Sequence, residues 1–472
     1  MMSMIYRFSA LLLLLLILAI GVHGNSDPTL SEFDVEAVTS RVEAMKNDAV
    51  EPQYNNIVQG YIKTYVLKRR DTAERILGLS VMYFPIFEKY LAENNLPLDL
   101  RYLPVVESAL NPRAISRVGA GGLWQFMPET GREMGLRIDQ YVDERCDPHK
   151  STQAAMVFLT KLYERYGRWE LALAAYNSGP GRVNRAIKRG RSRNFWRIRR
   201  YLPRETRNYV PAFIAATYLL NHYDQHELNP NYPQLDLQVS ETVKIFESFS
   251  FYEIAQVTGL SLDVIDKLNP SYELGYIPTD SRGQYLTLPR RVMSAFQHYA
   301  TLRQQHPNLR ESYALAPVTP SMLSSEELYL RTIYLVQPGD ELHQLSAALN
   351  CTVHQLRAWN QLKNNQLSPG QELVVYQPRE NHRFIRNARM EEEMKMLDQR
   401  LGVSVAPQSQ LKWEKDPLDG QKRIFYYVKK TERLKDIARK LPGTTIGDLL
   451  TLNDYQLSTR LKPGTRVCIQ EL

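Results

Sequence analysis

The sequence of 472 residues predicts a multidomain protein in which an all-α domain precedes small α+β modules. Up to about residue 225 the apolar residues recur at helical spacing, and this part shows no convincing strand pattern. After residue 240 a strand–helix–helix–strand (βααβ) pattern occurs three times, which is an internal repeat. Polar segments, the first of them with several prolines, separate the repeats and are typical of linkers. The predicted architecture is therefore one helical domain followed by βααβ modules.

The chain begins with the features of an exported protein. Arg7 gives a positive start, Leu11–Ile20 is apolar but short for a membrane span, and Gly24 is a small residue at the expected cut. We therefore expect residues 1–24 to be a signal peptide and the mature protein to lie in the periplasm or cell envelope. An uncleaved N-terminal anchor is the alternative. No cysteine lies near the cut, so we expect no lipid on an N-terminal cysteine.

Cysteine and histidine usage gives no sign of a metal or redox site. Cys146, Cys351 and Cys468 are odd in number and lie in three separate regions, which fits neither a disulfide framework nor metal-ligand spacing. The nine histidines are scattered, and no phosphate loop or serine-hydrolase motif occurs. We expect no metal and no cofactor.

Positive charge is concentrated in one segment. Eleven Lys or Arg residues lie between Arg182 and Arg207, with Glu205 as the one acid. Such a run attracts a polyanion or an anionic surface. Because the chain is expected to be exported, we expect no nucleic acid. The alternatives are contact with an anionic surface, including peripheral association with a membrane, and a solvated helix face.

The helical part is expected to comprise an N-terminal helical segment, residues 25–78, and a main domain, residues 79–230. Apolar spacing predicts helices at residues 58–66, 78–91, 97–110, 128–135, 152–166, 171–176 and 209–223. Pro104 lies inside the third of these and is expected to kink it. Three glycines between residues 119 and 122 predict a turn before the fourth.

The repeats are expected at residues 240–290, 333–377 and 425–470, with linkers at residues 291–332 and 378–424. An asparagine ends the second predicted helix of each repeat, at Asn269, Asn360 and Asn453. Proline-glycine precedes the last strand of the second and third repeats, as a tight turn requires.

One carboxyl group has a distinctive setting. Glu107 lies near the end of a mostly apolar helix, ahead of the glycine turn. Apolar surroundings and the negative end of a helix dipole both raise the pKa of a carboxyl group. A carboxylic acid that stays protonated near neutral pH can act as the general acid in glycosidic bond cleavage. The alternative is a surface glutamate paired with Arg101 or Arg113.

Ordinary glycosidases use two carboxyl groups. The sequence does not exclude a second one among the acids that follow, which are Glu129, Glu133, Asp139, Asp143, Glu144 and Asp147. If Glu107 acts alone, the substrate must itself stabilise the positive charge at its anomeric carbon. A 2-acetamido group can do this, which points to an N-acetylated sugar.

Four short motifs resemble those of the soluble-type lytic transglycosylases (glycoside hydrolase family 23), and they occur in that family's order. They are Glu107-Ser108, residues 122–128 (GLWQFMP), residues 175–179 (AYNSG) and residues 205–210 (ETRNYV). The resemblance covers about residues 79–223 and implies a lysozyme-like α-domain. The three repeats resemble LysM modules, which bind the N-acetylglucosamine-containing glycan of peptidoglycan.

The resemblance implies a single catalytic acid, Glu107, which protonates the oxygen of the β-1,4 bond between N-acetylmuramic acid (MurNAc) and N-acetylglucosamine (GlcNAc). The MurNAc acetamido group assists, and Glu107 then deprotonates the 6-hydroxyl, which closes a 1,6-anhydro ring without water. Six further residues are expected to line the cleft: Ser108, Gln125, Tyr176, Asn177, Glu205 and Tyr209. Trp124 and Phe126 are candidates for stacking on sugar rings.

Peptidoglycan glycan strands are thus the expected partner, and cell-wall remodelling or turnover the expected role. The first and last repeats depart from the LysM pattern in their turns, which leaves their glycan binding open. Two other functions remain as alternatives: a lysozyme-like hydrolase that uses water, and a non-catalytic peptidoglycan-binding scaffold.

Overall fold

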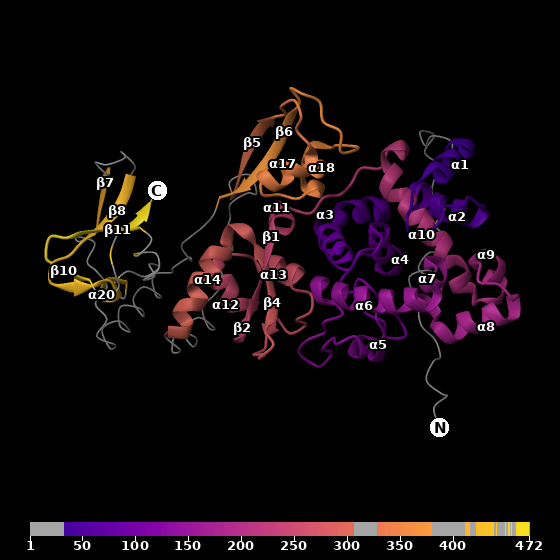
Figure 1. Ribbon diagram of the computed structural model, residues 1–472, viewed down its shortest axis with the longest axis horizontal. Coiled ribbons are helices and arrows are strands. Elements are labelled where there is room, and N and C mark those ends of the chain that lie inside the picture. Colours follow the sequence, from indigo (N-terminus) through magenta and orange to yellow (C-terminus); the bar gives the residue numbers. More distant parts are fainter. Residues whose placement is uncertain are drawn as a thin grey trace. The chain divides into compact units, whose positions relative to one another are not determined.

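The computed structural model describes residues 33–305, 328–379, 411–415 and, with short gaps, 422–471 (Figure 1). The expected signal peptide and most of both linkers lie outside these residues. Within the described part, no helix combines the length and the apolar character needed to cross a bilayer. The chain divides into two compact units, residues 1–294 with 317–381, and residues 295–316 with 382–472.

Helices build the first part of unit 1, and the all-α prediction is confirmed. The helices are α1 (Val35–Ala44), α2 (Asn56–Lys63), α3 (Arg70–Glu93), α4 (Leu103–Ser108), α5 (Pro128–Glu133), α6 (Pro148–Tyr166), α7 (Trp169–Ser178), α8 (Pro180–Gly190), α9 (Phe195–Ile198), α10 (Arg204–His222) and α11 (Leu235–Gln238). Asp34, Asn55 and Asp147 accept hydrogen bonds from the free N–H groups at the starts of α1, α2 and α6.

The N-terminal helices and the main domain share one core. α3 runs without a break through the expected boundary between residues 78 and 79. Val42 of α1 and Val58 of α2 are completely buried in the same cluster as Phe87 of α3. The segment before residue 79 is therefore packed as part of the helical domain.

The segment that carries Glu107 differs from the expected kinked helix. Residues Leu98–Tyr102 form a 3-10 helix (η2), and α4 begins only at Leu103. Pro104 lies in the first turn of α4, where its missing N–H would have no partner in any case. The expected kink at Pro104 was wrong because the proline begins a helix instead of interrupting one.

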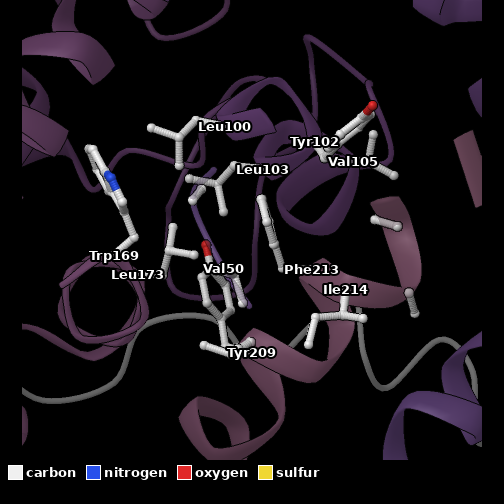
Figure 2. Packing of buried hydrophobic residues seen from close by; sticks show 14 of the residues in the cluster. Val50, Leu100, Tyr102, Leu103, Val105, Trp169, Leu173, Tyr209, Phe213 and Ile214 are labelled. Carbon is white, nitrogen blue, oxygen red and sulfur yellow. The ribbon is translucent and has the colours of Figure 1, made fainter. Parts of the chain in front are cut away.

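α10 lies at the centre of the helical core. Figure 2 shows Leu103 of α4 together with Leu173 of α7 and Phe213 of α10 in one cluster of buried side chains. Tyr209 lies one turn before Phe213, so the two side chains share a face of α10. The packing that buries Phe213 thereby also holds Tyr209 against the helix that carries Glu107.

The first βααβ module has a pair of strands with two helices between them in the sequence. Its elements are β1 (Ser240–Ile245), β2 (Phe249–Ser250), α12 (Phe251–Thr258), α13 (Leu262–Leu268), β3 (Tyr276–Ile277) and β4 (Gln284–Pro289). β1 pairs antiparallel with β4, with Val243 opposite Leu286. The short pair of β2 with β3 is an addition that the sequence pattern does not predict.

Polar contacts attach this module to the helical domain. Arg113 donates to the Asp266 carboxylate at 2.8 Å, and Arg137 donates to Asp280 at 3.1 Å. The backbone N–H of Asp143 donates to the Ser271 carbonyl at 2.9 Å.

The second module also belongs to unit 1. It consists of β5 (Tyr329–Leu335), α17 (Leu342–Ala348), α18 (Val353–Asn360) and β6 (Glu372–Pro378), with β5 and β6 antiparallel. His354 on α18 lies 2.9 Å from the Glu88 carboxylate of α3, and the Trp359 indole N–H donates to the Gln238 side chain at 3.0 Å. This module is therefore in direct contact with the helical domain.

Unit 2 contains the third module. Its described elements are β8 (Lys422–Tyr427), β9 (Glu432–Arg433), α20 (Leu434–Ala438), β10 (Arg460–Leu461) and β11 (Arg466–Glu471), and β7 (Leu411–Lys415) adds a third strand beside β8. β7 falls within the expected linker 378–424. α14 (Arg290–Gln305) occupies the start of the other expected linker. Most of the predicted second helix of the module, 446–452, lies outside the described residues.

The repeated asparagine joins the second helix to the last strand in every module. The Asn360 side-chain amide donates to the Leu356 carbonyl and to the Val374 carbonyl, and its oxygen accepts from the Val374 N–H at 2.6 Å. Asn269 and Asn453 make the same three contacts in their own modules. This explains why the sequence repeats an asparagine at this point.

Candidate active site

Glu107 lies in the last turn of α4 and is buried, with 8% of its surface exposed. The Tyr209 hydroxyl donates a hydrogen bond to its carboxyl oxygen. Neither arginine considered as a surface partner pairs with it, because Arg101 lies 3.0 Å from Glu88 and Arg113 pairs with Asp266. Glu107 is therefore a buried carboxyl group and not half of a surface salt bridge.

Burial raises the pKa of Glu107 to about 8. The hydrogen bond from Tyr209 lowers it and the nearby charge of Glu205 raises it, but both effects are smaller than that of burial. Glu107 consequently keeps its proton at neutral pH. A protonated carboxyl group in this position can donate to an ether oxygen and, once ionised, can take a proton back.

The glycine turn holds the loop after α4 against a buried arginine. Gly122 has φ +82°, and a Cβ at this position would lie 1.7 Å from the Arg145 carbonyl oxygen, so only glycine fits. The Arg145 guanidinium donates to the carbonyls of Gly119 (2.6 Å) and Phe126 (3.1 Å) and pairs with Asp143 at 2.7 Å. Arg145 thus supports the loop, a role that the motifs of the sequence do not predict. The sequence signal that could have indicated this role is the run of charged residues Asp143-Glu144-Arg145 directly before Cys146.

Ser108 and Gln125 act on the backbone of the same loop. The Ser108 hydroxyl is buried and lies 3.0 Å from both the Pro104 and the Leu123 carbonyls. Gln125 has φ +49°, and its side-chain amide donates to the carbonyls of Ala114 and Gly122 at 2.9 Å each. Both residues hold the loop in place beside Glu107. The expectation that Ser108 lines the cleft is corrected, since only 2% of it is exposed.

Trp124 and Phe126 belong to the core, which corrects the expectation that they stack on sugar. Trp124 is fully buried, its indole N–H donates to Thr152 at 2.9 Å, and its ring packs on Phe87. Phe126 is 2% exposed and lies against Phe158. Side chains this deeply buried offer no ring face to a glycan.

Tyr176 lies beside the same loop and is half-buried. Its hydroxyl donates to the Trp124 carbonyl at 2.7 Å, and burial together with the charge of Glu107 raises its pKa well above the usual value. It stays neutral and connects α7 to the loop that carries Gln125.

Asn177 at the end of α7 meets the first turn of α10. Its side-chain amide donates to Glu205 at 3.2 Å, and the Thr206 hydroxyl donates to its oxygen at 2.8 Å. Burial raises the pKa of Glu205 to about 7, while Asn177 and the charge of Arg182 lower it. Glu205 lies close enough to Glu107 to influence its pKa, so two carboxyl groups with raised pKa values share one site.

Four of the six acids considered as a second catalytic carboxylate have structural partners. Asp143 pairs with Arg145, Glu144 with Lys150 at 2.5 Å, and Asp139 with Arg137 at 2.6 Å. Asp147 accepts from the backbone N–H groups that begin α6. Among the described residues no cluster of three or more His, Cys, Asp or Glu side chains could hold a metal ion.

Three family models match the chain. The Transglycosylase SLT domain matches residues 84–198, and the LysM-like domain of lytic transglycosylase MltD matches residues 239–304. The LysM domain matches residues 334–375 and 426–470. Glu107, Gln125 and Asn177 all lie inside the first of these matches.

Curated relatives show the same likeness. The chain is 30% identical over 340 residues to membrane-bound lytic murein transglycosylase D of Escherichia coli (strain K12), covering 69% of this chain and 71% of the relative. It is 33% identical over 107 residues to the soluble lytic murein transglycosylase of that strain, covering 21% and 17% of the two chains. The crystal structure of the 70 kDa soluble lytic transglycosylase from Escherichia coli is 28% identical, with a TM-score of 0.26 and 30% and 24% of the two chains covered.

Three findings agree with one another. They are the 69% of this chain that is covered by the first relative, the SLT domain match around Glu107 and the LysM domain matches that follow it. The chain belongs to the family of membrane-bound lytic murein transglycosylase D, which are peptidoglycan lytic transglycosylases with a lysozyme-like domain and LysM modules.

Proposed function

We propose that the protein cleaves the β-1,4 bond between MurNAc and GlcNAc with Glu107 as its one catalytic acid and base. The observation that carries this proposal is the burial of Glu107, which raises its pKa to about 8 and keeps it protonated at neutral pH. Glu107 lies in the last turn of α4 and accepts a hydrogen bond from the hydroxyl of Tyr209, which distinguishes it from Glu205.

In the first step Glu107 gives its proton to the oxygen of the glycosidic bond, and the GlcNAc side leaves as an alcohol. The carbonyl oxygen of the MurNAc acetamido group attacks the anomeric carbon from the opposite face, so the positive charge is held in a five-membered ring. No protein nucleophile is needed in this step.

In the second step the ionised Glu107 takes the proton of the MurNAc 6-hydroxyl. The 6-oxygen attacks the anomeric carbon, the bond to the acetamido oxygen breaks, and a 1,6-anhydro ring forms. The proton lost in the first step has returned, and no water has been consumed. The hydrogen bond from Tyr209 to the carboxylate stabilises the charged form between the two steps.

The surrounding residues position the sugar and the acid. Tyr209 orients the Glu107 carboxyl group, and Tyr176 and Gln125 hold the loop that borders it. Asn177 and Glu205 offer amide and carboxyl oxygens to sugar hydroxyls. Ser108 contributes indirectly, through the Leu123 carbonyl.

The LysM modules bind peptidoglycan, and we propose that they keep the enzyme on the glycan strand. The proposed division has the helical domain up to residue 230, modules at 240–290, 333–377 and 425–470, and linkers between the last three parts. The apolar start of the chain supports export across the inner membrane and a place of action in the cell envelope. The runner-up function, a hydrolase on the same fold, would use the same acid with water in place of the 6-hydroxyl.

Mass analysis of the muropeptides released from purified sacculi tests the proposed reaction. We expect MurNAc ends that are one water lighter than reducing ends, and no release by Glu107→Gln. Reducing ends alone would establish the hydrolase. Unchanged release by Glu107→Gln would move the acid to another residue, and no release by the wild-type protein would favour the scaffold.

A further inference from the structure

α8 and the turn before α10 form an open groove with a volume of about 560 Å³. α8 supplies four basic residues to its lining, Arg182, Arg185, Lys188 and Arg189. The aromatic and apolar part of the lining comes from Tyr201–Pro203. The groove therefore combines positive charge with an apolar surface, and only the charge can be predicted from the sequence.

Some arginines of the basic run hold the backbone, and others line the groove. Arg193, Arg199 and Arg207 donate to backbone carbonyls of Tyr166 (2.6 Å), Arg207 (2.6 Å) and Leu202 (2.8 Å), respectively. These three hold their own chain together. Three of the groove residues, Arg185, Lys188 and Arg189, are exposed instead.

No salt bridge neutralises the charge of the groove within the described part of the chain. None of Arg182, Arg185, Lys188 and Arg189 forms a salt bridge with a described carboxylate. Arg185, Lys188 and Arg189 are exposed. Four like charges on one short helix repel each other, so an anionic ligand in the groove would relieve that repulsion.

The groove lies next to Asn177 and Glu205 of the candidate site. α8 begins three residues after Asn177, and Pro203 lies two residues before Glu205. Asn177 and Glu205 are joined by a hydrogen bond of 3.2 Å, which brings the two walls together at this end. Arg182 lines the groove, donates to the Ser178 carbonyl at 3.0 Å and lowers the pKa of Glu205 by its charge.

We propose that this groove binds the free carboxylate groups of the peptide stems carried by the glycan that is being cleaved. The proposal rests on the proposed function, since it takes peptidoglycan as the substrate. Each MurNAc bears a short peptide with free carboxylates, and a stem next to the cleaved bond would extend beside the cleft. Guanidinium groups bind carboxylates with paired, charge-assisted hydrogen bonds. A concave surface beside the cleft suits a flexible peptide better than the flat face of a membrane.

The test compares two substrates and two matched variants of the full-length protein. The substrates are glycan strands with their peptide stems and the same strands stripped of peptide by an amidase. The groove variant is Arg185→Gln with Lys188→Gln, and the control is Arg191→Gln with Arg197→Gln, two exposed residues of the same run outside the groove. All three proteins are assayed for bonds cleaved, and kcat/KM with stems is divided by kcat/KM without stems.

We expect the wild-type protein and the control to prefer strands with stems. In the groove variant the ratio of kcat/KM with stems to kcat/KM without stems should be about tenfold lower, as removal of two solvent-accessible ion pairs would give. The preference of the wild-type protein should also decline with added salt. An equal preference in all three proteins, or a loss that the control shares, overturns the proposal.

Vesicles containing phosphatidylglycerol separate the other source of negative charge. If the groove variant loses vesicle binding but keeps the preference for stems, the groove binds lipid and the proposal is wrong. The preference for stems is measured by counting cleaved bonds, so it does not depend on whether the new ends are anhydro or reducing. The chemical nature of the ends is determined separately by mass analysis.

Discussion

At the scale of the residue, the protonation of Glu107 links stability to function. Its pKa is raised from 4.5 to about 8 by burial, so the folded state holds a proton that the unfolded state releases above pH 4.5. Below pH 4.5 both states are protonated and folding bears no cost from this group. The cost grows as the pH rises from 4.5 to 8 and is then constant. Above pH 4.5 the buried Glu107 carboxyl group therefore lowers the free energy of unfolding, which a neutral residue at this position would not do.

Replacement of the acid should remove this penalty. We expect Glu107→Gln to be more stable than the wild-type protein by about 4 kcal/mol at pH 8, with a difference that shrinks to near zero at pH 4. Urea unfolding followed between these pH values measures it. Glu88→Gln is the control with the opposite sign, because His354 and Arg101 lower the pKa of Glu88. A Glu107→Gln difference that does not vary with pH would show that Glu107 is ionised at neutral pH.

The loop beside Glu107 depends on a glycine for two separate reasons. Gly122→Ala would meet both an unfavourable positive φ and the Arg145 carbonyl oxygen, so we expect it to abolish cleavage and to lower the melting temperature strongly. Gly135→Ala has a similar φ of +89° with no atom within 4 Å, and it should cost only about 1 kcal/mol. Thermal unfolding and turnover of the two variants decide this. Equal losses would mean that φ alone matters.

At the scale of the element, each module is closed by one asparagine. Asn360→Ala removes three hydrogen bonds and takes the side-chain partner from the N–H and carbonyl of Val374, which we expect to cost about 2–4 kcal/mol. Hydrogen exchange over residues 353–378 should show faster exchange at Val374. Asn364→Ala is the control, because Asn364 is exposed and caps only the loop at Gln366. Protection of Val374 that survives Asn360→Ala would contradict this role.

The order of the elements could be predicted from the sequence, because apolar spacing and turn residues act over a few positions. The helices α6, α12 and α13 and the strand pairs of the first two modules follow that spacing. Pro104 begins a helix and does not kink one, and the apolar spacing alone is the same in both cases. Two-residue strands such as β2 are too short to leave a pattern.

The site was predictable only in part, because burial depends on distant parts of the chain. Glu107, Asn177 and Tyr209 come together as the motifs indicate. Trp124 looked equally suitable for sugar and for core, and only its contact with Phe87 on α3 decides. The support from Arg145 was hidden because it acts on backbone carbonyls, which carry no sequence signature.

At the scale of the whole molecule, the first two modules are joined to the helical domain and the third belongs to another unit. The contacts of Arg113 with Asp266 and of His354 with Glu88 connect residues 153 and 266 positions apart. Contacts at such separation have no local pattern. The first two modules thus share their stability with the helical domain.

Two truncations separate anchoring from folding. We expect removal of residues 382–472 to weaken binding to sacculi while leaving the cleavage of short soluble glycans within about twofold, because unit 1 remains whole. Removal of everything after residue 330 should also lower the melting temperature, since Glu88 and Gln238 lose their partners on α18. Sedimentation with sacculi, turnover of soluble glycan and thermal unfolding provide the three readouts. Loss of turnover of soluble glycan on removal of residues 382–472 would show that unit 2 contributes to the cleft.

We propose that one carboxyl group, Glu107, performs the chemistry while its neighbour Glu205 holds the substrate. Glu107→Gln and Glu205→Gln are matched changes at the two carboxyl groups with raised pKa values. Turnover of the same peptidoglycan by both variants is the most direct measurement. We predict a loss of at least about 1,000-fold in kcat for Glu107→Gln, as removal of an essential acid gives, and about 10-fold for Glu205→Gln. Equal losses, or a larger loss for Glu205→Gln, would contradict the claim.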